Sequence, residues 1–529
     1  MPSTLYQDYP PDLTQGEEEY LLSNLKDWCI AHGIAVRPPP SFVSKGQDPS
    51  GVLATTAPVT LFPSLFPRSC FDEAHAIQTT YNELYAAIAR DEEWLYGIVK
   101  ELVGIDDFTA KLWEVHEAVK KEGYVQVGLA GPTYRIEFLR YQALTLGLFR
   151  SDYMVHLDPS DSNASPEIKQ VEFNTIASSF GGLSGEVSQL HNVLSKIRAY
   201  PQSAKRIITK SNMPVSESAS NLAAGLAAAH HAYGEPQISR ETCVLFIVQD
   251  PERNVFDQRH LEWNLQKQDI RTFRLPFHRT LIDTRLDFKR KLVYTPPHAP
   301  ATAYEVTTVY FRAGYSPDDY PTPEAWAARL HLERSNAIKC PSILTQLAGC
   351  KKVQQVLATP NSLHLERFLG TKEKIDRVRA TFAPIYPLDS SEAGLEAKKL
   401  ATEPETAQRY VLKPQREGGG NNIYRMAIPK FLKSEPEENW PAYILMEMIE
   451  PPAQKNAIFR NGEVQKGGVI CELGIYGACL WRNELEGSGT KSEVLKNTQA
   501  GYLLRTKGDQ SEEGGVAAGF GAIDSVCLV

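Results

Sequence analysis

The sequence predicts a mixed protein, α/β or α+β, built from several folding units. Short runs of β-branched and aromatic residues alternate along the chain with segments that have helix start signals or an alanine-rich composition. The chain has 529 residues, and single hydrophobic cores stop growing beyond roughly 250–300 residues, so about two to four units are expected.

The chain up to residue 311 offers two loops, one helix and two strands. Residues 37–51 (RPPPSFVSKGQDPSG) are expected to form a surface loop, because proline does not fit a helix interior. Residues 210–217 (KSNMPVSE) have the composition of a linker, and the alanine-rich residues 219–233 after them are predicted to be a helix. Residues 242–249 and 307–311 are predicted to be buried strands.

A second helix is predicted to begin after Thr322. Pro323 would take the first helical position, and Glu324 would put an acidic side chain in the first turn. The helix is expected to continue through AWAARLHLERSNAIK, which ends at residue 339. Residues 241–349 would then contain strand, helix, strand and helix, an order that could form one α/β unit.

The chain beyond residue 351 is richer in predicted strands. Residues 409–412, 442–446 and 468–473 are expected to be strands, and residues 433–441 (KSEPEENWP) a loop.

The composition argues against several classes of protein. The formal charge is −8, and lysines and arginines are scattered rather than gathered in a basic stripe, so no nucleic-acid partner is expected. The most apolar stretches, such as residues 242–248, are far shorter than the ~20 residues that span a bilayer, so no membrane partner is expected either.

The cysteines and the chain start favour a cytoplasmic protein. Residues 1–19 are polar and acidic and do not resemble a signal peptide. The 8 cysteines are widely spaced, without a C-x-x-C pair, which is typical of reduced thiols. Neither they nor the histidines make a zinc-ligand pattern, so any metal is expected to be a hard, oxygen-bound ion.

The most informative segment is residues 413–424, KPQREGGGNNIY, directly after the predicted strand RYVL. Three consecutive glycines would let the backbone approach a ligand and point amide N–H groups at anionic oxygens. Lys413 and Arg416 add positive charge, and Glu417 adds a hard oxygen ligand. The pattern is neither the P-loop nor the G-x-G-x-x-G fingerprint, and alone it also fits a flexible hairpin tip.

A second segment, residues 170–175 (QVEFNT), carries two oxygen donors. Glu172 and Asn174 are two positions apart on a predicted strand and would point to one face, while Val171 and Phe173 would face the core. Such donors suit Mg²⁺, which takes few protein oxygens and completes its octahedron with phosphate oxygens and water. The alternative is a solvated polar face on an edge strand.

A third segment lies near the end of the chain, at residues 501–519 (GYLLRTKGDQSEEGGVAAG). Arg505 and Lys507 are alternate residues after an apolar pair, and a GGVAAG loop follows whose small residues permit close approach to a small substrate. The alternative is a charged strand end with a tight turn.

These segments belong to a longer series of ordered blocks: QVEFNTIASSFGGL, FDQRHLEWNL, FRAGY, TQLAGCKKVQQVL, KPQREGGGNN, ILMEMIEP and LLRTK…GGVAAG. The series resembles the eukaryotic-type glutathione synthetase family from about residue 58 to the last thirty residues. The resemblance implies ATP- and Mg²⁺-dependent ligation of glycine to γ-glutamylcysteine through an acyl phosphate, in a homodimer.

The resemblance also implies a circularly permuted ATP-grasp fold with an inserted α/β substrate-binding domain and a glycine-rich lid. Residues 1–240 would be the N-terminal part of the ligase body, residues 241–349 the substrate-binding domain, and residues 350–529 the C-terminal ATP-grasp part. The lid would lie at about residues 390–468.

Carried over position by position, the resemblance assigns three sets of residues. The set implied for ATP is Glu172, Lys351, Lys413, Pro414, Gln415, Arg416, Glu417, Gly418, Gly419, Gly420, Asn421, Asn422, Tyr424, Met446, Glu447, Met448, Ile449, Glu472, Lys507 and Glu513. The set implied for the other substrates is Arg150, Ile176, Ala177, Ser178, Ser179, Glu252, Arg253, Asn254, Gln258, Arg312, Ala313, Gly314, Tyr315, Arg505, Val516 and Ala517. The set implied for Mg²⁺ is Glu172, Asn174 and Glu417.

The arginines suit the dipeptide substrate, because guanidinium binds carboxylate in a two-pronged fork. Arg505 is expected to stabilise the charge of the tetrahedral intermediate, a role that can be worth ~3 kcal/mol. For Arg150 the alternative is a surface ion pair with Asp152. Two positions depart from the animal members: Ala313 stands in place of an acidic residue and Met448 in place of a basic one.

Two other functions stay open at this point. The first is an ATP-grasp ligase with another acceptor, such as β-alanine or serine, and the GGVAAG loop separates it from a glycine-using enzyme because bulkier residues there accompany β-alanine use. The second is a non-catalytic relative that senses a thiol peptide or a nucleotide. A pure sensor would not need the carboxylates at Glu172 and Glu417.

Overall fold

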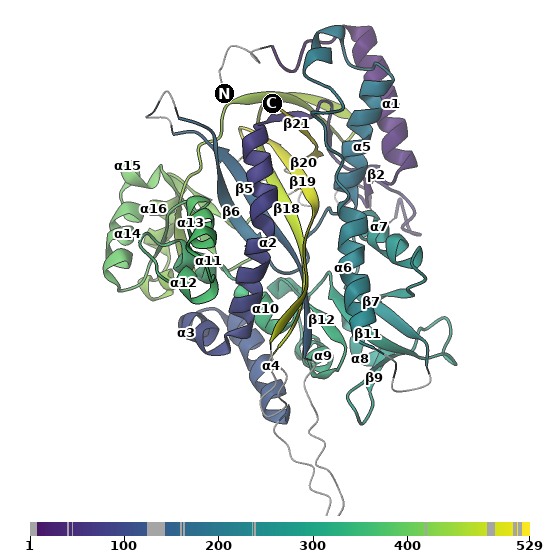
Figure 1. The fold of residues 1–529 in the computed structure, drawn as a ribbon, viewed down its shortest axis with the longest axis vertical. Helices are drawn as coiled ribbons and strands as arrows, with labels where there is room; N and C mark the ends of the chain where they lie inside the picture. Colours follow the sequence, from purple (N-terminus) through teal and green to yellow (C-terminus); the bar gives the residue numbers. More distant parts are fainter. Residues whose placement is uncertain are drawn as a thin grey trace, which may run out of the picture.

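The computed structural model describes residues 8–39, 42–44, 46–123, 143–158, 161, 164–234, 236, 240–417, 420–483, 492–511, 516 and 521–529. Within this part of the chain a 13-stranded mixed sheet forms the centre of the molecule (Figure 1). Its strands, from one edge along the main path, are β17 (Gln454–Arg460), β3 (Val59–Thr60), β20 (Gly521–Asp524), β19 (Glu493–Gly508), β18 (Glu463–Arg482), β5 (Leu144–His156), β12 (Ile338–Cys340), β11 (Tyr304–Phe311), β10 (Leu292–Tyr294) and β9 (Thr284–Leu286). Three strands branch from this path: β6 (Glu167–Asn174) pairs with β5, and β7 (Thr242–Val248) pairs with β11 and with β8 (Thr272–Pro276).

Helices cover both faces of the central strands. The alternating side chains of β18 explain this, because Tyr476, Ala478 and Leu480 enter one apolar core while Ile475 and Trp481 enter another. The first core is covered by α1 (Gln15–Ala31), α5 (Leu183–Lys196) and α6 (Ser218–Ala232). The second is covered by α2 (Arg68–Arg90), α3 (Glu92–Val103), α4 (Asp107–Gly123), α10 (Ile343–Ala348), α11 (Lys351–Ala358), α12 (Leu365–Phe368) and α13 (Lys372–Ala380). Figure 1 shows α2 on one side of β18 and the α5–α6 column on the other.

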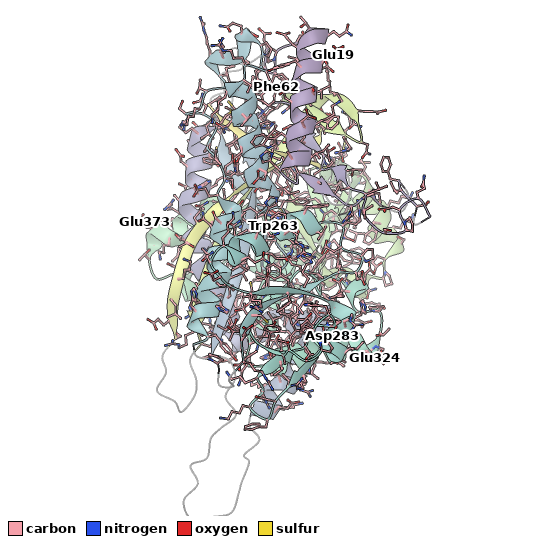
Figure 2. The ribbon with its side chains drawn as sticks, turned by 90° about the vertical axis from the view of Figure 1, so that its right-hand side faces the viewer. Glu19, Phe62, Trp263, Asp283, Glu324 and Glu373 are labelled. Carbon is pink, nitrogen blue, oxygen red and sulfur yellow. The ribbon has the colours of Figure 1, made fainter. Side chains whose placement is uncertain are left out.

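One end of the central sheet is a parallel α/β unit. The strands β8, β7, β11 and β12 run parallel to one another, and β10 pairs antiparallel with β11 and with β9. The helices of this part are α7 (Val255–Gln266), α8 (Thr280–Asp283) and α9 (Pro323–Arg334). Figure 2 shows Asp283 and Glu324 of this unit close together toward one end of the molecule, with Glu19 and Phe62 toward the other.

A separate antiparallel sheet of four strands stands beside the central sheet. It contains β13 (Ile385–Pro387), β16 (Tyr443–Glu447), β14 (Tyr410–Pro414) and β15 (Ile423–Tyr424). Its helices are α14 (Glu392–Thr402), α15 (Pro404–Ala407) and α16 (Ala427–Ser434). Two small sheets complete the described strands, β1 (Ala35–Val36) with β2 (Thr55–Thr56), and β4 (Ser64–Phe66) with β21 (Val526–Leu528).

Most predicted elements are confirmed. The strands expected at residues 242–249 and 307–311 are β7 and part of β11, and the alanine-rich helix is α6. The three later strands are β14, β16 and part of β18, which is 20 residues long. The described residues of the proline-rich segment 37–51 contain no helix or strand.

Two boundaries were predicted wrongly. The helix that begins after Thr322 ends at Arg334, not at residue 339, because Ser335 is extended and the next segment pairs as β12 with β11 and β5. The segment 433–441 is not a simple loop, since it contains the end of α16 and most of a 3₁₀ helix, Glu437–Ala442. In both places tertiary contacts override the local signal.

No helix among the described residues is long and apolar enough to cross a membrane. All 8 cysteines belong to the described part of the chain, and each is a free thiol.

Candidate active site

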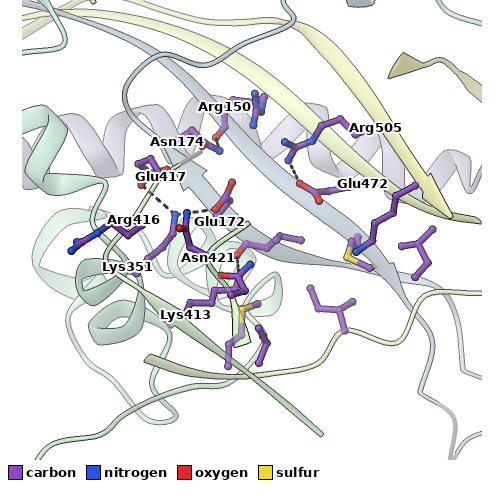
Figure 3. Close-up of a pocket in the computed structure, with 18 of the residues that line it drawn as sticks. Arg150, Glu172, Asn174, Lys351, Lys413, Arg416, Glu417, Asn421, Glu472 and Arg505 are labelled. Atoms are coloured by element: carbon purple, nitrogen blue, oxygen red, sulfur yellow. Dashed lines mark hydrogen bonds and ion pairs between the residues drawn. The ribbon is translucent and has the colours of Figure 1, made fainter. Parts of the chain in front are cut away.

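A cavity of about 350 Å³ lies between the central sheet and the four-stranded sheet. The central sheet contributes one wall from β5, β6, β18 and β19, and the four-stranded sheet contributes the other from β14, β15 and β16. Figure 3 shows side chains from both sheets pointing into the space between them. The cavity therefore collects residues that are far apart in the sequence.

Most residues that the sequence analysis assigned to ATP line this cavity. They are Glu172, Lys351, Lys413, Arg416, Glu417, Asn421, Asn422, Tyr424, Met446, Glu447, Met448, Ile449, Glu472 and Lys507. Three assigned residues, Pro414, Gln415 and Gly420, are described but do not line it. Gly418, Gly419, Glu513 and Ala517 lie outside the described residues.

The residues assigned to the other substrates divide into two groups. Those that line the cavity are Arg150, Ile176, Ala177, Ser178, Ser179, Tyr315, Arg505 and Val516. Those that do not are Glu252, Arg253, Asn254, Gln258, Arg312, Ala313 and Gly314.

Lys351 stands between two carboxylates on the cavity wall. It is the first residue of α11, and its Nζ lies 2.9 Å from Glu172 Oε2 and 3.3 Å from Glu417 Oε1 (Figure 3). Burial raises the pKa of Glu417 to about 7, helped by the negative charge of Glu172 and opposed by Lys351. Burial would also raise the pKa of Glu172, but Lys351, Lys413 and Arg505 hold that pKa well below its ordinary value. Of the two carboxylates, Glu417 is therefore the one that takes up a proton more readily.

Lys413 is held at the cavity by an irregularity in β6. The register of β6 against β5 shifts between Glu172 and Gln170, which makes Val171 an extra residue in a β-bulge. Val171 lines the cavity and, as expected, also packs against an apolar core cluster, that of the four-stranded sheet, and its carbonyl oxygen accepts a hydrogen bond of 2.9 Å from Lys413 Nζ. Burial lowers the pKa of Lys413 to about 8. Phe173 does enter the core, where its ring stacks on Tyr85 at 3.8 Å.

One part of the cavity is apolar. Its wall is formed by Met154, Val171, Val411, Met446, Met448, Ile449, Pro451 and Ile470. Methionine side chains adapt to the shape of a flat ring, so this wall suits a nucleotide base. Met448 belongs to this apolar wall, although animal relatives were expected to carry a basic residue at that position.

Two arginines meet at a buried carboxylate. Arg150 Nε and Nη2 donate to Asp152 Oδ1 and Oδ2 at 2.6 and 2.8 Å, and Arg505 Nη2 donates to Asp152 Oδ2 at 2.9 Å. Arg505 also bonds to Glu472. The predicted alternative of a surface pair is wrong, because Arg150 and Asp152 are both buried. The sequence analysis did not propose Asp152 as a site residue, and its alternation with Arg150 on a strand was the available signal.

The loop at residues 176–180 is held in a strained shape. Ala177 and Phe180 have φ values of 51° and 69°, a region that non-glycine residues rarely adopt. Asp257, which the sequence analysis did not assign, accepts bonds from the backbone N–H groups of Phe180 and Gly182 at 2.8 and 2.7 Å. Tyr476, also unassigned, donates to the carbonyl of Ser179 at 2.6 Å.

Arg312 supports this loop rather than facing the cavity. Its Nη1 donates to Ser178 O at 2.9 Å and its Nη2 to Ser179 Oγ at 2.8 Å. Ala313, the next residue, is fully buried in the apolar core of the parallel unit, and a side chain with a charge would be desolvated there.

The two residues that precede Glu417 in the glycine-rich segment, Gln415 and Arg416, are bonded to helices outside the four-stranded sheet or to residues next to them. Gln415 Oε1 accepts from the backbone N–H of Lys352 at 3.0 Å, and Arg416 forms an ion pair with Asp106, at the start of α4. These bonds place Glu417, which follows directly, beside Lys351.

The donor set at the cavity fits a hard divalent cation. Glu172 and Glu417 both offer carboxylate oxygens around one ammonium group, and Asn174 donates its amide N–H to Asp152 at 2.9 Å, which leaves its carbonyl oxygen for a ligand. Oxygen donors of this kind suit Mg²⁺. A divalent cation would also relieve the charge repulsion that contributes to the raised pKa of Glu417.

Comparison with known proteins gives one consistent family. Residues 15–528 match the family described as "Eukaryotic glutathione synthase, ATP binding domain". The chain is 39% identical to the glutathione synthetase large chain of Schizosaccharomyces pombe, over 97% of this chain and 98% of that protein. It is 37% identical to the glutathione synthetase of Homo sapiens, over 96% of both chains. It is 36% identical to the chloroplastic glutathione synthetase of Arabidopsis thaliana, over 98% of this chain and 87% of that protein.

A solved structure shares the fold. It is a glutathione synthetase-like effector from Globodera pallida in its apo form, with a TM-score of 0.70, 20% sequence identity and coverage of 98% of both chains.

Proposed function

The chain belongs to the eukaryotic glutathione synthase family and is an ATP-dependent ligase, and from this premise we propose that its cavity joins glycine to γ-glutamylcysteine with Mg²⁺ as cofactor. The products are glutathione, ADP and phosphate. The expected circularly permuted ATP-grasp architecture agrees with a cavity that lies between two sheets.

The observation that carries this proposal is the order of charged groups along β6. Lys413 donates a hydrogen bond to the carbonyl oxygen of Val171, and Lys351 donates one to the carboxylate of Glu172. Asn174 donates to Asp152, the carboxylate that also binds Arg150 and Arg505. At about 3.3 Å per residue these positions span about 10 Å, the scale of an extended triphosphate. The apolar wall adjoins Val171 at one end, and the arginines that suit a carboxylate substrate stand at the other.

The chemistry follows from this order. The cysteinyl carboxylate resists attack by an amine, so its oxygen first attacks the γ-phosphorus of ATP, the bond to the β-phosphate oxygen breaks, and ADP leaves. The glycine nitrogen then attacks the carbonyl carbon of the acyl phosphate, the carbon–oxygen bond to phosphate breaks, and the nitrogen loses a proton. Phosphoryl transfer is mostly a matter of alignment and charge neutralisation, which Lys351 and Lys413 provide.

The remaining roles are assigned to the chain's own residues. Glu172, Glu417 and Asn174 would hold Mg²⁺, which when bound neutralises phosphate charge. Arg505 stabilises the oxyanion of the tetrahedral intermediate, because its guanidinium faces the cavity beside Arg150. The residues assigned to ATP and to the other substrates in the sequence analysis complete the two ends of the site.

The domain limits and the assembly are part of the proposal. Residues 1–240, 241–349 and 350–529 are the three parts, and β14, β15 and β16 of the four-stranded sheet lie in the lid at about residues 390–468. A lid is needed because water would destroy the acyl phosphate. We place the enzyme in the cytoplasm as a homodimer.

The test is ADP release from ATP with γ-glutamylcysteine, measured with glycine, without an acceptor, and with β-alanine or serine in its place. Rapid release that needs both γ-glutamylcysteine and glycine supports the proposal. Faster release of ADP with β-alanine or serine would contradict glycine as the acceptor. Nucleotide binding without ADP release under any condition would contradict the ligase activity. Discrimination by one methylene is worth only ~1–3 kcal/mol, so slow use of β-alanine is expected.

A further inference from the structure

Asp152 lies beneath the candidate site and touches three of its residues. It sits on β5, its side chain is 0% exposed, and it does not line the cavity. Its Oδ1 accepts from Arg150 Nε at 2.6 Å. Its Oδ2 accepts from Arg150 Nη2 at 2.8 Å, from Asn174 Nδ2 at 2.9 Å and from Arg505 Nη2 at 2.9 Å. One carboxylate thus ties together side chains from β5, β6 and β19.

The strand register places Asp152 between β6 and β18. On one side of β5 it is opposite Glu172 of β6, and on the other side it is opposite Gly474 of β18. Alternation along β5 puts Arg150 and Asp152 on the same face, so the fork between them closes within one strand.

Gly474 leaves the space that this ion pair occupies. A Cβ atom at that position would lie 2.7 Å from Asp152 Oδ1 and 2.7 Å from Arg150 Cδ, closer than real Cβ contacts. Neither side chain can move away from an added Cβ without breaking the two hydrogen bonds between Arg150 and Asp152. The sequence of β18 is therefore matched to the ion pair on β5.

The guanidinium of Arg150 depends on this carboxylate for its direction, and that of Arg505 is shared between Asp152 and Glu472. Burial would lower the pKa of Arg150, but the charge and hydrogen bonds of Asp152 raise it above its ordinary value. The other bond of Arg150 is a single contact of 3.2 Å to Ser179 O. Without the charge of Asp152, Arg505 would keep Glu472 as its partner, but Arg150 would lose both bonds of its fork and would no longer be held beside Arg505.

We propose that Asp152, given room by Gly474, is a positioning residue that aims Arg150 and Arg505 at the carboxylate-bearing substrate. This inference rests on the proposed function. It assigns to Asp152 no contact with substrate, since the residue lies outside the cavity lining.

The first test is the variant Asp152→Asn, which keeps the shape and removes the charge. We expect kcat/KM for γ-glutamylcysteine to fall at least 100-fold, through both kcat and KM. The Kd for ADP, measured by calorimetry without Mg²⁺ so that Asn174 holds no metal, should stay within threefold of the unaltered chain, because Lys413 and the apolar wall do not contact Asp152. This split between dipeptide use and nucleotide binding is what a general loss of structure would not produce.

A control variant removes the charge of a similar fork outside the site, whose arginine is more exposed than Arg150, at 38% against 5%. Asp283 makes the same fork, with Arg279 Nε and Nη2 donating to its oxygens at 2.6 and 2.7 Å, but it lies on α8 away from the cavity lining. Asp283→Asn should leave kcat/KM within threefold.

A second variant keeps every charge. Gly474→Ala should lower kcat/KM for γ-glutamylcysteine at least tenfold with the Kd for ADP unchanged, and it decides the question if Asp152→Asn does not fold. Gly467→Ala is its control, since Gly467 is on the same strand and an added Cβ there meets nothing within 4 Å.

Two results would overturn the inference. One is folded Asp152→Asn, or Gly474→Ala, with kcat/KM within threefold of the unaltered chain. The other is an equal loss of dipeptide use, ADP affinity and thermal stability, which would make Asp152 merely structural. If the unaltered chain releases no ADP with γ-glutamylcysteine and glycine, the proposed function fails first, and that control is run beside the variants.

Discussion

Lys351 and Lys352 are neighbouring buried lysines that each bridge two carboxylates, and they should behave differently on substitution. Lys351 Nζ lies 2.9 and 3.3 Å from Glu172 and Glu417, while Lys352 Nζ lies 3.2 and 3.5 Å from Glu101 and Asp389. Of the two, only Lys351 lines the cavity. The variants Lys351→Met and Lys352→Met therefore remove the same charge from inside and outside the site.

The effect on stability can be worked from the contacts. Removing one partner of a buried ion pair costs about 3–5 kcal/mol. The carboxylates beside Lys351 are each 23% exposed, so water screens them and the lower value, about 3 kcal/mol, applies. With an unfolding entropy of about 2 cal/mol/K per residue, that loss lowers Tm by only about 3 °C in a chain of 529 residues. Lys352 should lose no more, because its partner Glu101 is 48% exposed.

The effect on activity should be much larger for Lys351. A preorganised charge at the transferring group is worth about 10²–10³ in kcat. We expect Lys351→Met to lose that factor in ADP release with γ-glutamylcysteine and glycine, and Lys352→Met to stay within about threefold, with Tm measured by calorimetry. Equal losses of activity in both variants, or Lys351→Met with more than a tenth of normal kcat, would refute the assignment of Lys351 to the transferred phosphate.

Three further predictions test the electrostatics and the bulge. Glu417 has a pKa of about 7 and must lose its proton to hold Mg²⁺, so the apparent Mg²⁺ affinity should fall about tenfold per pH unit below pH 7 and level off above it. Calorimetry at several pH values checks this. A Glu417→Gln variant with the same pH dependence of Mg²⁺ affinity would contradict it. Lys413 has a pKa of about 8, so its ammonium group loses its proton as the pH rises above 8, and the Kd for ADP should increase. A Kd that is unchanged between pH 7 and about 9.5 would show that Lys413 does not bind phosphate. Phe173→Ala removes a buried stacked ring and should lower stability by about 3–5 kcal/mol. Val171→Ala, on the cavity side, should lower Tm less than Phe173→Ala does but raise KM for ATP more. The reverse order of the two variants would contradict the bulge.

Much of the site could be found in the sequence because its motifs are local. The segment KPQREGGGNN carries Lys413 and Glu417, and both line the cavity. The pair Glu172 and Asn174 also lines it from β6. Their residue types suit phosphate and Mg²⁺ but also fit a hairpin tip and a solvated edge strand, so the family resemblance was needed to choose between these interpretations. The family resemblance added the substrates.

Other features depended on contacts that no local pattern encodes. Glu172 and Lys351 are 179 positions apart, and their 2.9 Å ion pair exists only because α11 packs beside β6. The bulge at Val171 arises from the register between β5 and β6. Arg312 was expected to face the substrate, but the packing of the parallel unit turns it to the loop at residues 176–180.

The sequence by itself determined the mixed fold class, most strands, the glycine-rich and acidic segments, and the type of chemistry, because each depends on residue types within a few positions. The tertiary structure alone decided which charges meet. Asp152 shows why. It lies two positions after Arg150, so the two residues resemble a surface ion pair, yet Asp152 is buried between β6 and β18 and its carboxylate is the common partner of two arginines. Burial and strand register are properties of the packed sheet, so the chain shows them only when it is folded.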